Sequence, residues 1–138
     1  MNNKQTFRGL ATVSFYAADV EAAKKWYTEL LSVEPYFERP GYVEFRIGDY
    51  QSELGIIDAR FAPKGMMPAP TGSIVYWHVD NVLEIFDKLI AMGAKEYEAI
   101  RDRSGGFVTA SVVDPFGNIL GIMHNPHYIE ILNLIKKE

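Results

Sequence analysis

The clearest indication of the fold is the stretch DPFGNILGIMHN, Asp114–Asn125, in which a turn-forming cluster runs directly into an apolar segment typical of a β-strand. Gly121 stands in the middle of this expected strand. Glycine weakens a strand interior, so it often marks a bulge or a surface that another group approaches closely. The approaching group is either a neighbouring part of the chain or a ligand, and the residue type alone does not choose between them.

Two earlier segments, TVSFYAADV (Thr12–Val20) and IVYWHVDNV (Ile74–Val82), repeat one pattern. Each is a run of β-branched and aromatic residues that ends in Asp or Asn followed by Val, which is typical of a strand that stops at a helix N-cap. Asp19 and Asn81 are the expected caps. After each cap, apolar residues recur at helical spacing and at the same offsets in both copies: Val20, Ala23, Tyr27 and Leu30, then Val82, Ile85, Leu89 and Met92. The pattern predicts two core helices.

Each expected helix is followed by three strand-like segments that are separated by turn residues. They read PYFERP, GYVEFRIGD and QSELGIID in the first half, and AKEYEAI, GGFVTASVVD and NILGIMH in the second. The sequence therefore predicts an α+β fold with two β-α-β-β-β modules in a single domain, 1–138. Module one is expected at about 8–58, a Pro- and Gly-rich loop at 59–72, module two at about 73–125 and an amphipathic C-terminal helix at about 127–137.

The composition limits the possible functions. The chain has 138 residues, of which 48% are hydrophobic and 23% charged, and these values are ordinary for one globular domain. Cysteine is absent, which excludes a disulfide framework, a thiolate nucleophile and a Cys-based zinc site. The formal net charge is −4 with both signs scattered, so no basic face can neutralise a phosphate backbone. Without a long apolar run or a secretory signal, we expect a cytoplasmic protein that binds neither nucleic acid nor membrane.

The two modules, the Asp-Val helix start, the Trp26-Tyr27 pair and the DPFGN turn that leads into LGIM resemble the vicinal oxygen chelate superfamily. This superfamily includes lactoylglutathione lyases, extradiol dioxygenases and bleomycin-binding resistance proteins. The resemblance covers roughly Leu10 to Pro126. It implies that the two modules pair their sheets into a U-shaped, half-open barrel with the site inside. It also implies a homodimer, since relatives commonly pair.

Metal-dependent members of the superfamily place ligands at equivalent positions in the first and last strands of each module. In this chain, the resemblance places Thr12, Ile74, Gly55 and Gly121 at those positions. A divalent site built from imidazole and carboxylate needs donors that these residues do not supply, so we expect no metal and no other cofactor. A shift of two positions in module one would reach Glu53. The two glycines are expected instead to open space in the cavity.

Side chains alternate between the two faces of a strand, which predicts the cavity lining. Val13, Phe15, Val75 and Trp77 suit the side that the helices cover. The residues expected to face a ligand are Thr12, Ser14, Tyr16, Ile74, Tyr76, His78, Gly55, Gly121 and Met123, with Glu53 on the same face. Aromatic and aliphatic bodies with a few polar groups suit a small organic molecule.

Three functions agree with these residues. One is binding of a small organic molecule in the barrel cavity without a metal, in the manner of a bleomycin resistance protein. An alternative is a metal-dependent lyase or dioxygenase related to lactoylglutathione lyase. The third is a metal-free enzyme in which His78 or Glu53 is the catalytic acid or base, because an imidazole with a pKa near ~6.5 exchanges protons near neutrality.

Overall fold

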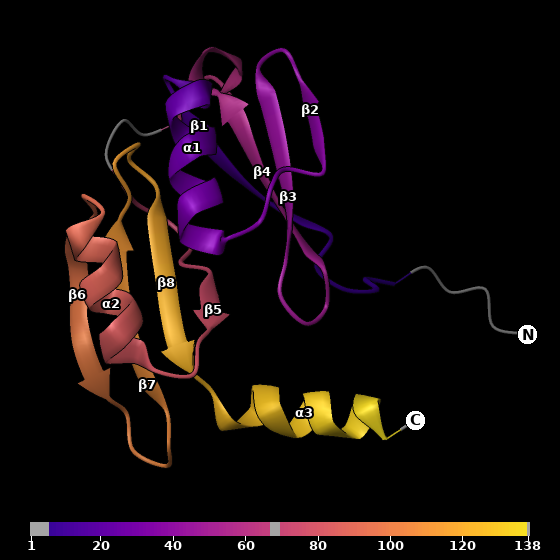
Figure 1. Ribbon diagram of the computed structural model, residues 1–138, viewed down its shortest axis with the longest axis vertical. Coiled ribbons are helices and arrows are strands. Elements are labelled where there is room, and N and C mark those ends of the chain that lie inside the picture. The colour runs from indigo at the N-terminus through magenta and orange to yellow at the C-terminus, as the bar shows by residue number, and fades with distance from the viewer. Residues whose placement is uncertain (1–5, 67–69, 138) are drawn as a thin grey trace, which may run out of the picture.

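The computed structural model of the chain describes residues 6–66 and 70–137 and confirms the α+β fold with two modules (Figure 1). Module one contains β1 (Thr12–Ala17), α1 (Val20–Leu31), β2 (Phe37–Arg39), β3 (Tyr42–Ile47) and β4 (Ser52–Asp58). A short 3-10 helix, η1 (Ala59–Phe61), follows. Module two contains β5 (Tyr76–His78), α2 (Val82–Ala91), β6 (Lys95–Asp102), β7 (Val108–Val113) and β8 (Ile119–His124), and the last helix is α3 (Pro126–Lys136).

The helix starts follow from local capping. The side chain of Asp19 accepts a hydrogen bond from the backbone N–H of Ala22 (3.0 Å), and that of Asn81 accepts one from Glu84 (3.0 Å). Each satisfies an N–H group that has no partner inside its helix. Asn125 caps α3 in the same way, and Pro126 follows it at a position where proline suits a helix.

Each module forms its own four-stranded sheet, in the order β1-β4-β3-β2 and β5-β8-β7-β6. The pairs β1–β4 and β5–β8 are parallel, and the other pairs are antiparallel. Among the described strands, none pairs across from one sheet to the other, so the barrel stays open. β1 and β5 therefore each keep one free edge.

The hydrophobic core lies on the helix side of both sheets and is continuous between the modules. It includes Phe15 and Phe45 of the first sheet and Val112 of the second, together with Tyr27 and Leu89 from the helices. The opposite face of the first sheet carries exposed polar side chains, such as that of Ser14. The predicted alternation along β1 therefore holds. No helix in the described part of the chain is long and apolar enough to span a membrane.

Candidate functional site

The space expected above the two strand glycines is filled by tyrosine rings. A Cβ atom added to Gly121 would lie 2.8 Å from Cδ1 of Tyr76 and 2.8 Å from the carbonyl oxygen of Val75. A Cβ atom on Gly55 would lie 2.8 Å from the hydroxyl oxygen of Tyr42. The group that approaches each glycine closely is thus a neighbouring part of the chain, and the expectation that Gly55 and Gly121 open the cavity is corrected.

The four positions that correspond to metal ligands in metal-dependent relatives do not form a ligand set. Ile74, Gly55 and Gly121 carry no donor atom in their side chains, and the hydroxyl of Thr12 lies 3.5 Å from the carbonyl oxygen of Glu53. In residues 6–66 and 70–137, no three His, Asp or Glu side chains gather in a way that could hold a metal ion. The residue types at this place do not fit the metal of those relatives.

The outward face of the first sheet carries a network of tyrosine and glutamate side chains. The Tyr42 hydroxyl donates to Glu44. The Tyr36 hydroxyl lies within hydrogen-bonding distance of Glu44 and of Oε2 of Glu53 (2.8 Å), and its single proton serves one of these carboxylates at a time. The hydrogen bond to Glu44 is the main cause that raises the pKa of Tyr36 to about 12. These tyrosines are hydrogen-bond donors to carboxylates at neutral pH.

A similar arrangement occupies the outward face of the second sheet. Oε1 of Glu98 accepts hydrogen bonds from the Tyr76 hydroxyl (2.9 Å) and the Ser111 hydroxyl (2.9 Å). These two bonds, that of Tyr76 first, lower the pKa of the Glu98 carboxyl. The ring that covers Gly121 is therefore held by Glu98.

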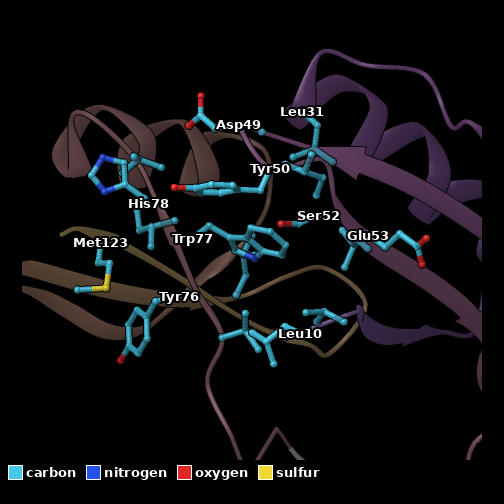
Figure 2. Close-up of a pocket in the computed structure, with 18 of the residues that line it drawn as sticks. Leu10, Leu31, Asp49, Tyr50, Ser52, Glu53, Tyr76, Trp77, His78 and Met123 are labelled. Carbon is cyan, nitrogen blue, oxygen red and sulfur yellow. The ribbon is translucent and has the colours of Figure 1, made fainter. Parts of the chain in front are cut away.

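The main cavity lies between the modules, where the β3–β4 turn (Gly48–Gln51) faces β5 and the two helices. Its volume is about 440 Å³. Its apolar lining includes Leu30, Leu31, Ile47, Trp77, Ile85 and Leu89. Figure 2 shows Leu31, Ser52 and Glu53 of module one on one side and Tyr76, His78 and Met123 of module two on the other. Both modules thus build one site.

The residues that were expected to face a ligand lie in three different places in the structure. Thr12, Glu53, Tyr76, His78 and Met123 line the main cavity. A second cavity of about 240 Å³, beside Asn118, is lined by Ser14 and Tyr16. Ile74, Gly55 and Gly121 line neither of these two.

Sequence interpretation missed the side chains that reach the main cavity from the helix side and from the β3–β4 turn. Leu31, Tyr50 and Trp77 are the clearest examples. Trp77 and Leu31 read as ordinary core residues, because the pattern assigns them to the side that the helices cover. A comparison of equivalent residues in the β3–β4 turn and the β7–β8 turn was the signal in the sequence that could have pointed to these cavity residues.

His78 is held at the end of β5. Its Nδ1 accepts a hydrogen bond from the backbone N–H of Asn125 (3.1 Å), so the neutral ring carries its proton on Nε2. Nε2 is buried, has no hydrogen-bond partner among the described residues and lies 3.7 Å from Oδ1 of Asp80. Burial, and then the nearby His124, lower the pKa of His78. In this arrangement neither ring nitrogen is free to accept a proton from a ligand.

Tyr128 of α3 joins His78 to the β3–β4 turn. Its ring stacks on that of His78, with centroids 4.6 Å apart and planes 7° apart, and meets the Tyr50 ring edge-on at 5.5 Å. Its hydroxyl donates to Oδ2 of Asp49 (2.8 Å). Burial and the bond to Asp49 raise the pKa of Tyr128 to about 12. The C-terminal helix thus fixes the turn on one side of the main cavity.

The fold and the site define a two-module protein with a ligand-sized cavity, and comparison with known proteins gives its family. The model of the glyoxalase/bleomycin resistance protein/dioxygenase superfamily matches residues 9–122. The chain belongs to this superfamily, which confirms the resemblance found in the sequence. Comparison with curated proteins found no match.

Solved structures share the fold at low sequence identity. A protein from Agrobacterium tumefaciens studied by solution NMR is 20% identical, with a TM-score of 0.72 over 86% of this chain and 98% of that one. A lactoylglutathione lyase from the same organism is also 20% identical, with a TM-score of 0.67 over 89% and 98%. A glyoxalase-related enzyme from Fulvimarina pelagi is 19% identical, with a TM-score of 0.67 over 87% and 90%. At these identities the likeness concerns the fold alone.

Proposed function

We propose that the chain binds a small organic molecule, without a metal, in the main cavity between its modules. The cavity itself carries this proposal, since its volume of about 440 Å³ lies in the range of known ligand pockets. Its lining is mainly aliphatic and aromatic, with a few polar groups, among them Ser52, Asp49 and Glu53. Removing apolar ligand surface from water there contributes about 25 cal/mol per Å².

The metal-dependent lyase and dioxygenase alternatives have less support from these residues. Their first requirement is a set of ligands, and Thr12, Ile74, Gly55 and Gly121 do not provide one. Among the described residues that line the main cavity, two are acidic, Asp49 and Glu53, and none is Lys or Arg. An anionic substrate would meet repulsion there.

The metal-free enzyme alternative depends on Glu53 and His78 as proton acceptors. Glu53 belongs to the lining of the main cavity, but its carboxylate lies on the outward face of the first sheet, where Oε2 is 2.8 Å from the Tyr36 hydroxyl. His78 is less suited to acid–base work, since Nδ1 already accepts from Asn125 and Nε2 is buried. Neither residue places a free proton acceptor in the main cavity, so metal-free catalysis has less support than metal-free binding.

We also propose that the partner of the chain is a second copy of itself. Exposed apolar side chains on α3 support this, since Ile131, Leu134 and Ile135 are 51%, 56% and 50% exposed and lie on one helical face. Sedimentation equilibrium should give twice the chain mass at micromolar concentration. A monomer mass across the whole concentration range would refute the dimer.

A pair of tryptophan variants tests the binding proposal. Leu31→Trp puts a larger side chain into the main cavity, whereas Leu83→Trp adds the same ring to the solvent side of α2, where Leu83 is 59% exposed. The probe is N-phenyl-1-naphthylamine, a neutral apolar dye that fluoresces when it leaves water. We expect the wild type and Leu83→Trp to bind it equally and Leu31→Trp to bind it about tenfold more weakly.

Equal binding by the wild type and both variants would contradict the proposed location of the ligand. Failure of the wild type to bind the dye, together with no retained organic mass in native mass spectrometry, would contradict small-molecule binding in this cavity. Thermal unfolding of both variants serves as the control for folding.

A further inference from the structure

The module repeat creates two equivalent junctions, one at the free edge of β1 and one at the free edge of β5, and the junction at β1 is closed by side chains. At this closed junction, the backbone N–H of Tyr16 on the free edge of β1 donates to Oδ1 of Asn118 (3.1 Å), and Nδ2 of Asn118 donates to the carbonyl oxygen of Tyr16 (2.9 Å). The side-chain carboxamide thus pairs with a strand edge as another strand would.

Aromatic rings fill the space behind this carboxamide. The hydroxyl of the buried Tyr27 donates to Oδ2 of Asp114 (2.5 Å), and the ring of Trp26 meets that of Phe116 edge-on at 6.2 Å. The closed junction therefore combines one carboxamide at the strand edge with an apolar aromatic filling.

The strand register identifies the equivalent residues at the other junction. Ser14 pairs with Gly55 in module one, and Tyr76 pairs with Gly121 in module two. Counting from these pairs, His78 corresponds to Tyr16 and Ser52 corresponds to Asn118. Counting from the helix caps Asp19 and Asn81, Leu89 corresponds to Tyr27, and counting back from the glycines, Gly48 corresponds to Asp114.

The residues at this open junction are smaller than their counterparts. Ser52 has no carboxamide, Gly48 has no side chain and Leu89 has no ring, and all three line the main cavity together with His78. The main cavity at the open junction thus corresponds to the volume that side chains fill at the closed junction.

The backbone of His78 faces this volume. The backbone N–H of Val79 donates to the carbonyl oxygen of Met123 (2.8 Å), and the carbonyl oxygen of Val75 accepts from the backbone N–H of Gly121 (3.0 Å). The backbone groups of Val75 and Val79 therefore point toward β8. Backbone groups along a strand alternate between its two edges, so the N–H and C=O of His78 point to the free edge of β5, as those of Tyr16 do on β1.

We propose that the open junction takes a small molecule that carries a primary carboxamide on an apolar aromatic body, with the carboxamide paired to the backbone N–H and C=O of His78. This inference rests on the proposed function and names the class of its ligand. The carboxamide and aromatic body of the ligand take the places that the Asn118 carboxamide and the rings of Tyr27 and Trp26 occupy at the closed junction. An uncharged amide also suits a lining that contains Asp49 and Glu53 and, among its described residues, no Lys or Arg.

Three ligands with the same naphthalene body distinguish the contribution of the carboxamide donor to affinity from the effect of a negative charge. 2-Naphthamide has the donor and acceptor of a primary carboxamide, N,N-dimethyl-2-naphthamide lacks the donor, and 2-naphthoate replaces the amide with a negative charge. Quenching of tryptophan fluorescence gives the dissociation constants, because Trp77 lines the cavity. We expect 2-naphthamide to bind at least about tenfold more tightly than either analogue, as expected when a buried donor loses its partner.

Two further readouts place the carboxamide. 2-Naphthamide should move the ¹⁵N–¹H resonance of His78 downfield, whereas the dimethyl analogue should not. Ser52→Asn would offer the β5 edge a carboxamide from the protein itself, so it should weaken 2-naphthamide binding about tenfold, whereas Leu83→Asn on the solvent side of α2 should not.

Equal affinities for the three naphthalenes, or preference for the carboxylate, would overturn the carboxamide inference. If N-phenyl-1-naphthylamine still binds in a manner sensitive to Leu31→Trp, the proposed function stands and only the ligand class fails. If neither the dye nor any naphthalene binds the wild type, both fail together.

Discussion

The closed and open junctions have equivalent backbone positions but different side chains. At the closed junction, Asp114, Asn118 and Tyr27 connect the modules through hydrogen bonds that are buried or partly buried. At the open junction, the equivalent positions hold Gly48, Ser52 and Leu89, and a cavity of about 440 Å³ remains. The comparison indicates that one junction provides stability, which leaves the other free to receive a ligand. Natural proteins commonly place such less filled regions at functional sites.

The largest expected effect is at Asp114. The Asp114 side chain accepts hydrogen bonds from the backbone N–H groups of Phe116 (2.9 Å) and Asn118 (2.8 Å) and from the Tyr27 hydroxyl (2.5 Å), and the residue is 3% exposed. Asp114→Ala leaves these donors without their partner, so we expect a loss of about 3 kcal/mol in the free energy of unfolding. Urea unfolding followed by circular dichroism measures it.

The matched control for Asp114 is Asp49 at the open junction. Asp49 is exposed and accepts one side-chain hydrogen bond, from Tyr128. Asp49→Ala should cost less than about 1 kcal/mol, because water replaces the lost partner. Equal losses for the two variants would remove the distinction between the junctions.

A second comparison uses the register-matched pair Asn118 and Ser52. Asn118→Ala removes both hydrogen bonds to the Tyr16 backbone, and we expect it to destabilise the protein by about 2 kcal/mol. Ser52→Ala removes a hydroxyl from the cavity wall and should change the free energy by less than about 0.5 kcal/mol. A larger loss for Ser52→Ala would show that both junctions stabilise the fold.

The two strand glycines give a smaller contrast. A methyl group at Gly121 would meet both the Tyr76 ring and the backbone oxygen of Val75 at 2.8 Å, and backbone cannot move aside cheaply. At Gly55 the obstacle is the Tyr42 side chain, whose hydroxyl end can shift. We expect Gly121→Ala to cost about 2 kcal/mol and Gly55→Ala about 1 kcal/mol by thermal unfolding. The reverse order would contradict the close packing at Gly121.

The smallest effect is the pH dependence that His78 adds to stability. Its folded-state pKa lies below the ordinary value of 6.5, mainly because of burial. As the pH falls through about 6.5, the unfolded chain therefore binds a proton first, and stability is lost down to the folded-state pKa. His78→Asn keeps an acceptor near the Asn125 N–H and should flatten the stability profile below about pH 6.5. An unchanged profile would exclude this contribution.

Much of the fold follows from local sequence signals. The caps Asp19 and Asn81, the helical spacing after each and the strand-like runs are short-range features, so they predicted the two modules. The DPFGN turn also pointed to the superfamily. These features depend on neighbours in the chain and can be recognised without tertiary structure.

The cavity was less predictable, because it depends on how the modules pack against each other. Alternation assigned Trp77 to the helix side, and no local pattern shows that space remains beside it. The position of the β3–β4 turn depends on Tyr128, which belongs to a helix far along the chain. The role of Gly121 likewise required the position of the Tyr76 ring.

We propose that the ligand binds at the open junction. The most direct test of this proposal is a ¹⁵N–¹H correlation spectrum of the labelled protein during titration with N-phenyl-1-naphthylamine. We expect shifts in the backbone amide resonances of Gly48–Ser52 and Val75–Val79, with those of Tyr16 and Asn118 unchanged. Shifts confined to Gly55, Ser111 and Gly121 on the outward faces of the sheets would contradict it and move the site there.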